Sequence, residues 1–266
     1  MDVTTGLKAE EKEPLPILMQ QSEYGDMYAN EETLWWYRGL RDFYIRDICA
    51  HLKPGARILD AGCGTGMNME FLISKGFEVE GFDLSPDAID FCLKRGLDHV
   101  RSGCMTEIPF EAASFDAVIN MDVLTMLDAD SRKAAIKELY RVLKPGGILL
   151  VNNAALEFLR SAHDDIIRLA IRYDLPTMKS ELTENCNATV LRSTYRVSLL
   201  FPVMFAAKMY KRILGWLGAV PSTDQNLTPR FLNGIFTVIM LLENRALQMF
   251  NAPIGSSVYV VTRLES

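Results

Sequence analysis

The sequence contains little that would build a metal site or a disulfide framework. Five cysteines and three histidines are scattered over 266 residues, and no two cysteines have the C-x-x-C spacing of metal and redox sites. We therefore expect no bound metal and no disulfide network, which is usual for a protein of a reducing compartment.

Positive charge is also in deficit. The chain has 28 Lys and Arg residues against 34 Asp and Glu residues, which gives a formal net charge of −6. Proteins that bind nucleic acid usually show the opposite balance, because phosphate contacts need clustered cations. Nucleic acid is therefore not an expected partner.

Long hydrophobic runs are absent as well. The longest, Val197–Ala207 and Ile235–Leu242, are much shorter than the roughly 20 apolar residues of a membrane-spanning helix. The first 13 residues lack the apolar segment of a secretory signal, so we expect a cytoplasmic protein without a membrane span. Hydrophobic residues nevertheless make up 49% of the chain, which is enough to bury the core of one large domain.

Hydrophobic periodicity predicts a helix first and then an alternation of strands and helices. The first helix is expected to begin at Asn30, as its N-cap, and to end before Pro54-Gly55. Five strands are then predicted near residues 57–60, 78–83, 99–101, 117–120 and 148–152, with helices between them near 68–75, after Ser85 and near 131–143. This order predicts βαβ units and a parallel sheet with helices on both faces.

The second half of the chain has a different pattern. A helix is predicted over His163–Tyr173, and strands over Thr189–Val197 and Ser256–Arg263. Two helical segments, about 199–217 and 229–250, lie between those strands. The predicted fold is therefore α/β, with a doubly wound, mostly parallel, seven-stranded sheet and a helical insertion before the last strand.

A glycine-rich turn follows the first predicted strand. Residues 58–66 read Ile-Leu-Asp-Ala-Gly-Cys-Gly-Thr-Gly, with Asp60 two positions before the first glycine. Glycines at this place let a ligand approach the backbone at a helix N-terminus. The G-x-G-x-G spacing differs from the G-x-G-x-x-G of dinucleotide sites, and an acid here would repel a pyrophosphate but suits an ammonium group. A tight turn without a ligand is the alternative interpretation.

A second acid ends the second predicted strand. Asp83 lies 21 residues after Gly62, where a carboxylate can accept both hydroxyls of a ribose. A helix-capping acid is the alternative. Together, Asp60, the glycines and Asp83 favour a nucleoside that carries an amino acid.

These motifs resemble those of the class I (Rossmann-like) S-adenosylmethionine-dependent methyltransferases. The similarity covers about residues 56–152 through four landmarks in the family's order, namely 58–66, 79–85, 103–127 and 141–151. It implies an enzyme with S-adenosyl-L-methionine as cofactor. It also implies three parts: an N-terminal tail and helical lid (1–55), a cofactor-binding core (56–152) and a C-terminal part (153–266) with a helical substrate cap at about 198–252.

The resemblance also assigns cofactor contacts to residues of this chain. They are Asp60, Gly62, Cys63, Gly64 and Gly66 for the methionine moiety, Asp83 and Leu84 for the ribose, Cys104 and Met105 for the adenine, Asn120 and Met121 for the methionine end, and Tyr28 and Arg38 of the lid for the carboxylate. For Tyr28 and Arg38, the alternative is an amphipathic helix packed on the sheet edge with an exposed arginine.

Two positions depart from the family pattern. Cys104 stands where the family usually has an aspartate for the adenine amino group, and Met126 stands where many relatives have histidine. A thiol is a poor acceptor, so the adenine is expected to be held by main-chain groups and apolar stacking. The loss of a histidine removes one candidate base.

Three residues are candidates for work on the acceptor. His163, followed by Asp164, is the predicted general base, since Ser161–Asp164 and Arg172-Tyr173 resemble a subgroup with a His-Asp pair; loop packing is its alternative. Asp122 is expected either to face the substrate or to cap a turn. Tyr195 is expected to orient the substrate or merely to pack.

The apolar insertion leaves three interpretations open. Its helices bury against each other and the sheet, or they roof a hydrophobic acceptor, or a helix with Lys208, Lys211 and Arg212 beside Trp216 touches an anionic bilayer. The last would be a weak peripheral contact.

The predicted function is transfer of a sulfonium methyl group to a small, largely apolar acceptor, with oxygen favoured, then carbon, then nitrogen. A non-catalytic cofactor-binding or partner scaffold of the same fold is the alternative, which the departures at Cys104 and Met126 favour. A nicotinamide-dependent oxidoreductase is disfavoured by the loop spacing.

Overall fold

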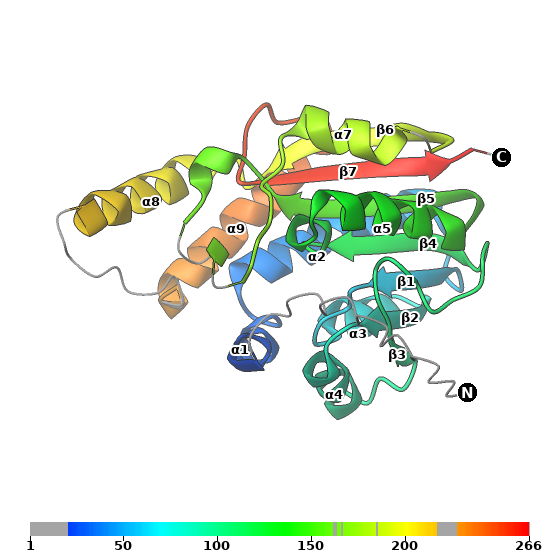
Figure 1. The fold of residues 1–266 in the computed structure, drawn as a ribbon. Coiled ribbons are helices and arrows are strands. Elements are labelled where there is room, and N and C mark those ends of the chain that lie inside the picture. Colours follow the sequence, from blue (N-terminus) through cyan, green and yellow to red (C-terminus); the bar gives the residue numbers. More distant parts are fainter. Residues whose placement is uncertain (1–20, 162–163, 166, 185, 217–227, 266) are drawn as a thin grey trace, which may run out of the picture.

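A single seven-stranded sheet organises the molecule (Figure 1). The computed structural model describes residues 21–161, 164–165, 167–184, 186–216 and 228–265. The strands are β1 (Arg57–Ala61), β2 (Glu78–Asp83), β3 (Val100–Ser102), β4 (Phe115–Met121), β5 (Leu143–Ala154), β6 (Ala188–Arg196) and β7 (Ser257–Leu264). Their order is β3-β2-β1-β4-β5-β7-β6, and β7 alone runs antiparallel to its neighbours. The predicted doubly wound, mostly parallel sheet is confirmed.

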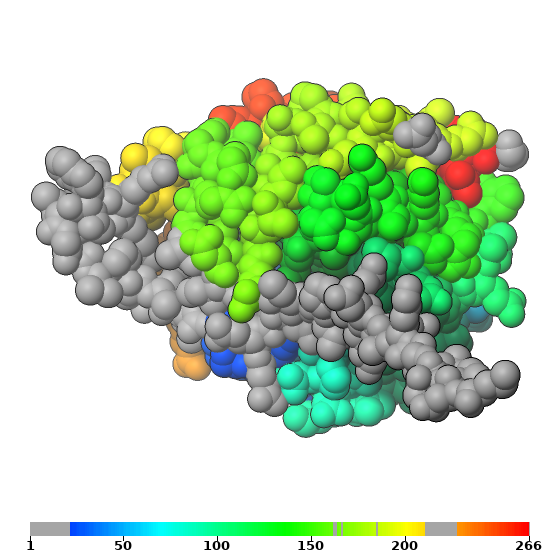
Figure 2. Space-filling model, in the orientation of Figure 1, coloured from blue at the N-terminus to red at the C-terminus, as the bar shows by residue number. Residues whose placement is uncertain are grey.

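Helices cover both faces of this sheet. They are α1 (Gln21–Asn30), α2 (Trp35–His51), α3 (Met67–Ser74), α4 (Pro86–Lys94), α5 (Ala129–Val142), α7 (Leu175–Thr183), α8 (Phe201–Trp216) and α9 (Arg230–Ala246). Helices α5 and α7 lie on the near face in Figure 2, and α2 and α9 pack together on the opposite face (Figure 1). Helices α8 and α9 form the predicted insertion between β6 and β7.

The hydrophobic core is built around central strands that are buried on both faces of the sheet. β1, β4 and β5 carry almost continuous apolar runs, such as Ile148–Val151, whose side chains are inaccessible. Central parallel strands covered by helices on both faces require such runs. Gly81 in β2 shows how closely a helix approaches, because a Cβ there would lie 2.5 Å from the Met69 sulfur of α3.

One predicted helix starts too early, and the helix predicted over His163–Tyr173 is not formed by residues 167–173. The chain forms α1 up to Asn30, turns, and starts α2 only at Trp35, because the Glu31 side chain points inward to Thr65 and Arg95 instead of extending one continuous helix. Residues 167–173 form turns and extended chain, because Arg172 is held by Asp164 and the backbone of this segment bonds to Thr125. The helix begins afterwards, at α7, where the Asp174 side chain caps it.

The sheet topology fixes where a ligand can bind. The strand order reverses direction between β1 and β4, and in open α/β sheets the crevice outside the carboxyl ends of the strands at such a point is the ligand site. The insertion lies at this same end of the sheet (Figure 1).

Candidate functional site

A cavity of about 1520 Å³ opens at the carboxyl ends of β1, β2, β4 and β5. Among the predicted site residues, it is lined by Gly62, Cys63, Gly64, Asp83, Leu84, Cys104, Met105, Met121 and Asp122. A drug-sized ligand usually needs roughly 300–1,000 Å³. The cavity therefore has room for a nucleoside-sized cofactor and a second molecule.

The glycine-rich turn passes from β1 into α3 in a left-handed conformation. Gly62, Gly64 and Gly66 have φ values of +81°, +53° and +86°. A Cβ on Gly66 would lie 2.6 Å from Leu97, and Gly66 does not line the cavity. This third glycine thus serves the packing of the turn against α4, whereas the first two expose their backbone to the cavity.

Asp83 is fixed across from this turn at the end of β2. Its Oδ2 accepts a hydrogen bond from the Gly64 N–H at 2.9 Å, and its Oδ1 accepts one from the Ser85 N–H at 2.9 Å. Burial raises the pKa of this carboxyl, although these backbone N–H groups favour its charged form. Each oxygen has a further lone pair, so the carboxylate can accept two hydroxyls of a ribose.

Asp60 lies beneath the turn and is completely buried. Neither of its carboxylate oxygens has a hydrogen-bond partner among the described residues. Burial, followed by the charges of Asp83 and Glu31, raises its pKa to about 8. A buried carboxyl without a partner is costly, and it fits a ligand that brings positive charge. S-adenosylmethionine, with its ammonium and sulfonium, is such a ligand.

Glu31 adds an acid that is not among the predicted site residues. Its buried carboxylate accepts hydrogen bonds from the Thr65 hydroxyl and from Arg95 Nη2, the latter at 2.6 Å. Burial raises its pKa. Because Thr65 belongs to the glycine-rich turn, these bonds hold the connection between α1 and α2 against that turn.

The predicted lid residues do not line the cavity. The Tyr28 ring lies against Phe91, with 4.8 Å between the centroids, and the Arg95 guanidinium lies 4.4 Å from the Tyr28 centroid. Arg38 is exposed to solvent. The cavity is instead reached by Tyr24 and Tyr37, and burial together with Asp83 raises the pKa of Tyr24 to about 12.

At the predicted adenine end, the cavity wall is formed by Cys104 and Met105. The Cys104 sulfur lies 3.2 Å from the Thr106 hydroxyl. Asn120 is buried behind this wall, where its amide donates to the Ala61 carbonyl at 2.8 Å and lies 3.9 Å from the Met105 sulfur. Asn120 therefore supports the wall rather than lining the cavity.

Asp122 is held by Asn152, which is held in turn by Arg196, and neither residue is among the predicted site residues. The Asn152 amide nitrogen lies 3.3 and 3.2 Å from the two Asp122 carboxylate oxygens, and the Asp122 backbone, at φ +62°, donates to the Asn152 carbonyl at 2.7 Å. The Asn152 side-chain oxygen Oδ1 accepts a hydrogen bond from Arg196 Nη1 at 3.1 Å. Burial raises the pKa of Asp122 to about 7, with Arg196, Asn152 and Arg172 opposing the rise.

Arg196 itself is fully buried in β6. Its Nε and Nη2 have no acceptor within the described part of the chain. Burial lowers its pKa to about 10, and Glu243 and Asp122 provide nearby negative charge. No local sequence signal points to this arginine, because its neighbours Asn152 and Asp122 come from two other strands.

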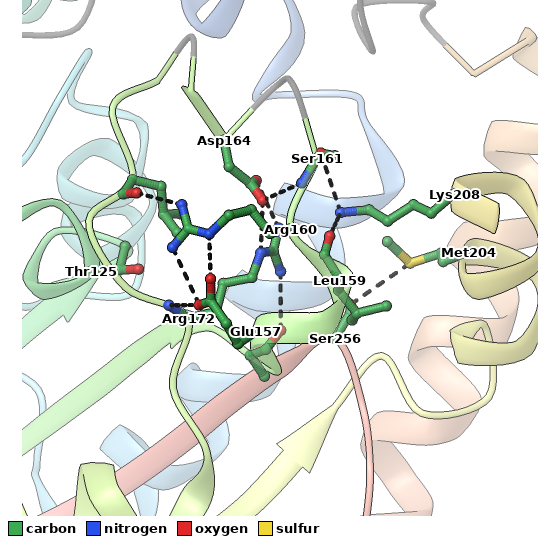
Figure 3. Close-up of polar contacts among 12 residues, drawn as sticks. Thr125, Glu157, Leu159, Arg160, Ser161, Asp164, Arg172, Met204, Lys208 and Ser256 are labelled. Atoms are coloured by element: carbon green, nitrogen blue, oxygen red, sulfur yellow. Dashed lines mark hydrogen bonds and ion pairs between the residues drawn. The ribbon is translucent and has the colours of Figure 1, made fainter. Parts of the chain in front are cut away.

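Described residues between β5 and α7 line part of the cavity, and Figure 3 shows their polar contacts. Arg172 holds Asp164 through two hydrogen bonds of 2.8 and 2.7 Å. Lys208 extends from α8 and donates to the Leu159 carbonyl at 2.6 Å. Arg172, Asp164 and Lys208 all line the cavity, so this side of the cavity is charged. The apolar part of the cavity wall is formed by Trp36, Met126, Met204 and Ala207.

The remaining predicted residues are placed as follows. His163 lies outside the described residues. The Tyr195 hydroxyl is buried away from the cavity and accepts a hydrogen bond from the Leu175 N–H at 3.1 Å, which anchors the start of α7.

Within the described part of the chain, no cluster of three or more His, Cys, Asp or Glu residues could hold a metal ion. No helix there is long and apolar enough to cross a membrane.

Residues 59–151 match the family model described as a methyltransferase domain. The chain is 34% identical over 112 residues to malonyl-[acyl-carrier protein] O-methyltransferase of Serratia marcescens, a match that covers 42% of this chain and 43% of that protein. The chain thus spans less than half the length of this relative.

Solved structures share the fold. A SAM-dependent methyltransferase from Archaeoglobus fulgidus superposes with a TM-score of 0.52 at 17% identity, covering 85% of this chain and 94% of its own. Phosphoethanolamine N-methyltransferase 2 of Haemonchus contortus, determined with S-adenosylhomocysteine, gives a TM-score of 0.59 at 16% identity and covers 92% of this chain and 58% of its own.

Proposed function

We propose that the chain, whose residues 59–151 match a methyltransferase domain and whose fold is that of class I S-adenosylmethionine-dependent methyltransferases, transfers a methyl group to a small, largely apolar acceptor, with oxygen the favoured atom, then carbon, then nitrogen. The observation that carries the proposal is the unpartnered, buried carboxyl of Asp60 beneath the glycine-rich turn. Its raised pKa leaves this carboxyl largely protonated at neutral pH without a ligand, and a positively charged methyl donor would favour its charged form.

The cofactor would be held by residues around the glycine-rich turn and at the end of β2. S-adenosylmethionine, when bound, supplies an electrophilic methyl group on a positively charged sulfur. Asp83 accepts the ribose hydroxyls, Asp60 offsets positive charge, and the backbone of Gly62 and Gly64 allows close approach. Cys104 and Met105 provide main-chain groups and apolar surface for the adenine, in place of the aspartate that the family uses.

The acceptor end has a candidate general base in Asp122. An oxygen acceptor with a high pKa must lose its proton as it attacks, and a positioned base contributes roughly 10²–10⁴-fold to such a step. Asp122 lines the cavity, and its pKa of about 7 leaves it able to take a proton near neutral pH. Asn152 fixes the direction of its carboxylate. His163 remains a second predicted base.

The apolar wall serves alignment and exclusion of water. Trp36, Met126 and Met204 line the cavity beyond Asp122. Correct alignment of the reacting groups is worth on the order of 7–11 kcal/mol. Such a wall suits a lipophilic acceptor in the cytoplasm or at a membrane surface, which the helical insertion would contact only peripherally.

Methyl transfer is tested with purified protein and methyl-labelled S-adenosylmethionine against a panel of lipophilic hydroxyl compounds. We expect label in at least one product with the wild type, and its loss with Asp122→Asn. Asp90→Asn, which changes an exposed acid on α4, should behave as the wild type. A folded protein that binds the cofactor and labels nothing would favour the non-catalytic scaffold.

A further inference from the structure

Helix α9 exposes apolar side chains along one face, while its buried face packs Met240 beside the polar residues Glu243 and Asn244. Phe231, Ile235, Val238 and Leu242 are 70%, 50%, 56% and 54% exposed, and their spacing places them along one face of the helix. An amphipathic helix of a globular protein normally turns such a stripe toward the core. Here the stripe, which we call the α9 stripe, faces solvent.

The opposite face of α9 binds the protein through polar groups. Asn233 accepts a hydrogen bond from the Trp35 N–H at 2.8 Å. Asn244 donates to the Gly39 carbonyl at 2.8 Å and to the Asp42 carboxylate at 2.9 Å. Met240 adds an apolar contact to Gly39. The orientation of the helix is therefore fixed by specific bonds to α2, and the α9 stripe is displayed by the native fold.

Exposed apolar residues continue beside this stripe. Leu199 and Val203, at the start of α8, are exposed. The Leu199 N–H donates to Glu243 of α9 at 2.7 Å, so the start of α8 lies against α9. Exposed apolar side chains gathered on one element and its neighbour in this way mark an interaction site.

The charges of the helical insertion indicate which kind of partner the α9 stripe fits. Residues 199–252 contain five cations (Lys208, Lys211, Arg212, Arg230 and Arg245) and two acids (Asp224 and Glu243), whereas the whole chain has more acids than cations. Glu243 is buried, and Arg230 and Arg245 are exposed at the two ends of α9. An apolar stripe flanked by cations fits an anionic lipid surface. A second copy of the chain is disfavoured, because it would bring these arginines face to face.

We propose that the α9 stripe, with Arg230 and Arg245, docks the protein on the surface of an anionic lipid bilayer, with α9 lying in the plane of the interface. The helix does not span the bilayer, since no described helix is long and apolar enough to do so. The acceptor cavity borders the same insertion through Met204 and Ala207. If the proposed function holds, docking brings that cavity to the lipid surface.

The test is sedimentation of the full chain with vesicles of phosphatidylcholine alone or with one third phosphatidylglycerol. We expect binding to the anionic vesicles that weakens as salt rises, and little binding to the neutral ones. F231S/I235S should remove most of the bound fraction. R230E/R245E should weaken binding by at least about 25-fold, at about fivefold per cation.

Matched controls separate docking from folding and from catalysis. Leu93→Ser changes a residue that is 54% exposed on α4, and Lys53→Glu reverses an exposed charge away from the insertion; both should bind vesicles as the wild type does. All variants should bind S-adenosylhomocysteine unchanged, whether or not methyl transfer is found. Absence of vesicle binding, equal binding to neutral vesicles, or a dimer in light scattering that F231S/I235S dissociates would overturn the proposal.

Discussion

Replacement of Asp60 by asparagine should stabilise the protein without cofactor while destroying its affinity for the cofactor. The folded-state pKa of Asp60 is about 8, raised first by burial and then by Asp83 and Glu31, against roughly 3.9 in an unfolded chain. The folded state therefore holds a proton that the unfolded state releases. Stability from this group is complete below about pH 4 and is lost as the pH rises toward 8.

The size of this loss follows from the two pKa values. At pH 7 the carboxyl lowers the free energy of unfolding by as much as about 4 kcal/mol relative to its protonated form. An asparagine has no such proton to lose. Between pH 5 and pH 8 the stability of Asp60→Asn relative to the wild type should therefore increase by about 3–4 kcal/mol.

Urea denaturation of both proteins at pH 5 and pH 8 measures this difference. Asp90→Asn, at an exposed position of α4, is the matched control and should follow the wild type at both pH values. S-adenosylhomocysteine should stabilise the wild type and leave Asp60→Asn unaffected. Identical pH dependence in the wild type and Asp60→Asn would refute the assignment of a buried, unpartnered carboxyl at this position.

Four further predictions concern the site. Asp83→Asn should weaken S-adenosylhomocysteine binding by at least tenfold in calorimetry, since a hydrogen bond to a charged group is worth roughly 1.5–3 kcal/mol; unchanged affinity would mean that the ribose is held elsewhere. Turnover of a hydroxyl acceptor should rise through about pH 7 as Asp122 loses its proton, and Asp122→Asn should abolish this rise. Arg196→Met should move this rise to higher pH, because the substitution removes a positive charge that favours the Asp122 carboxylate and leaves only Asn152 and Arg172 to do so; an unmoved profile would contradict the role of Arg196. His163→Ala should lower turnover of that acceptor without altering cofactor affinity, and wild-type turnover would remove His163 from the mechanism.

The cofactor end of the site was predictable because its parts are local in sequence. The turn from Asp60 to Gly66 joins one strand to the next helix, and Asp83 ends the neighbouring strand, so a strand–turn–helix pattern suffices to place them. The parallel sheet was predictable for the same reason, since each strand and its following helix are contiguous.

The acceptor end was not predictable in this way. Asp122, Asn152 and Arg196 come from three different elements, and only the sheet brings them into one chain of hydrogen bonds. The break between α1 and α2 was missed because Asn30 followed by acids is a good local helix start, whereas the bonds of Glu31 to Thr65 and Arg95 decide the conformation. Tertiary contacts outweighed local propensity at both places.

The central claim is that the cavity beside the glycine-rich turn takes an amino-acid-bearing nucleoside with positive charge. Calorimetric titration of the wild type with S-adenosylhomocysteine and with NADH, at pH 7 in two buffers of different ionisation enthalpy, tests it most directly. We expect one S-adenosylhomocysteine per chain with release of protons from the buried carboxyls, and no binding of NADH. A folded chain that leaves S-adenosylhomocysteine unbound, or that takes NADH instead, would contradict the account.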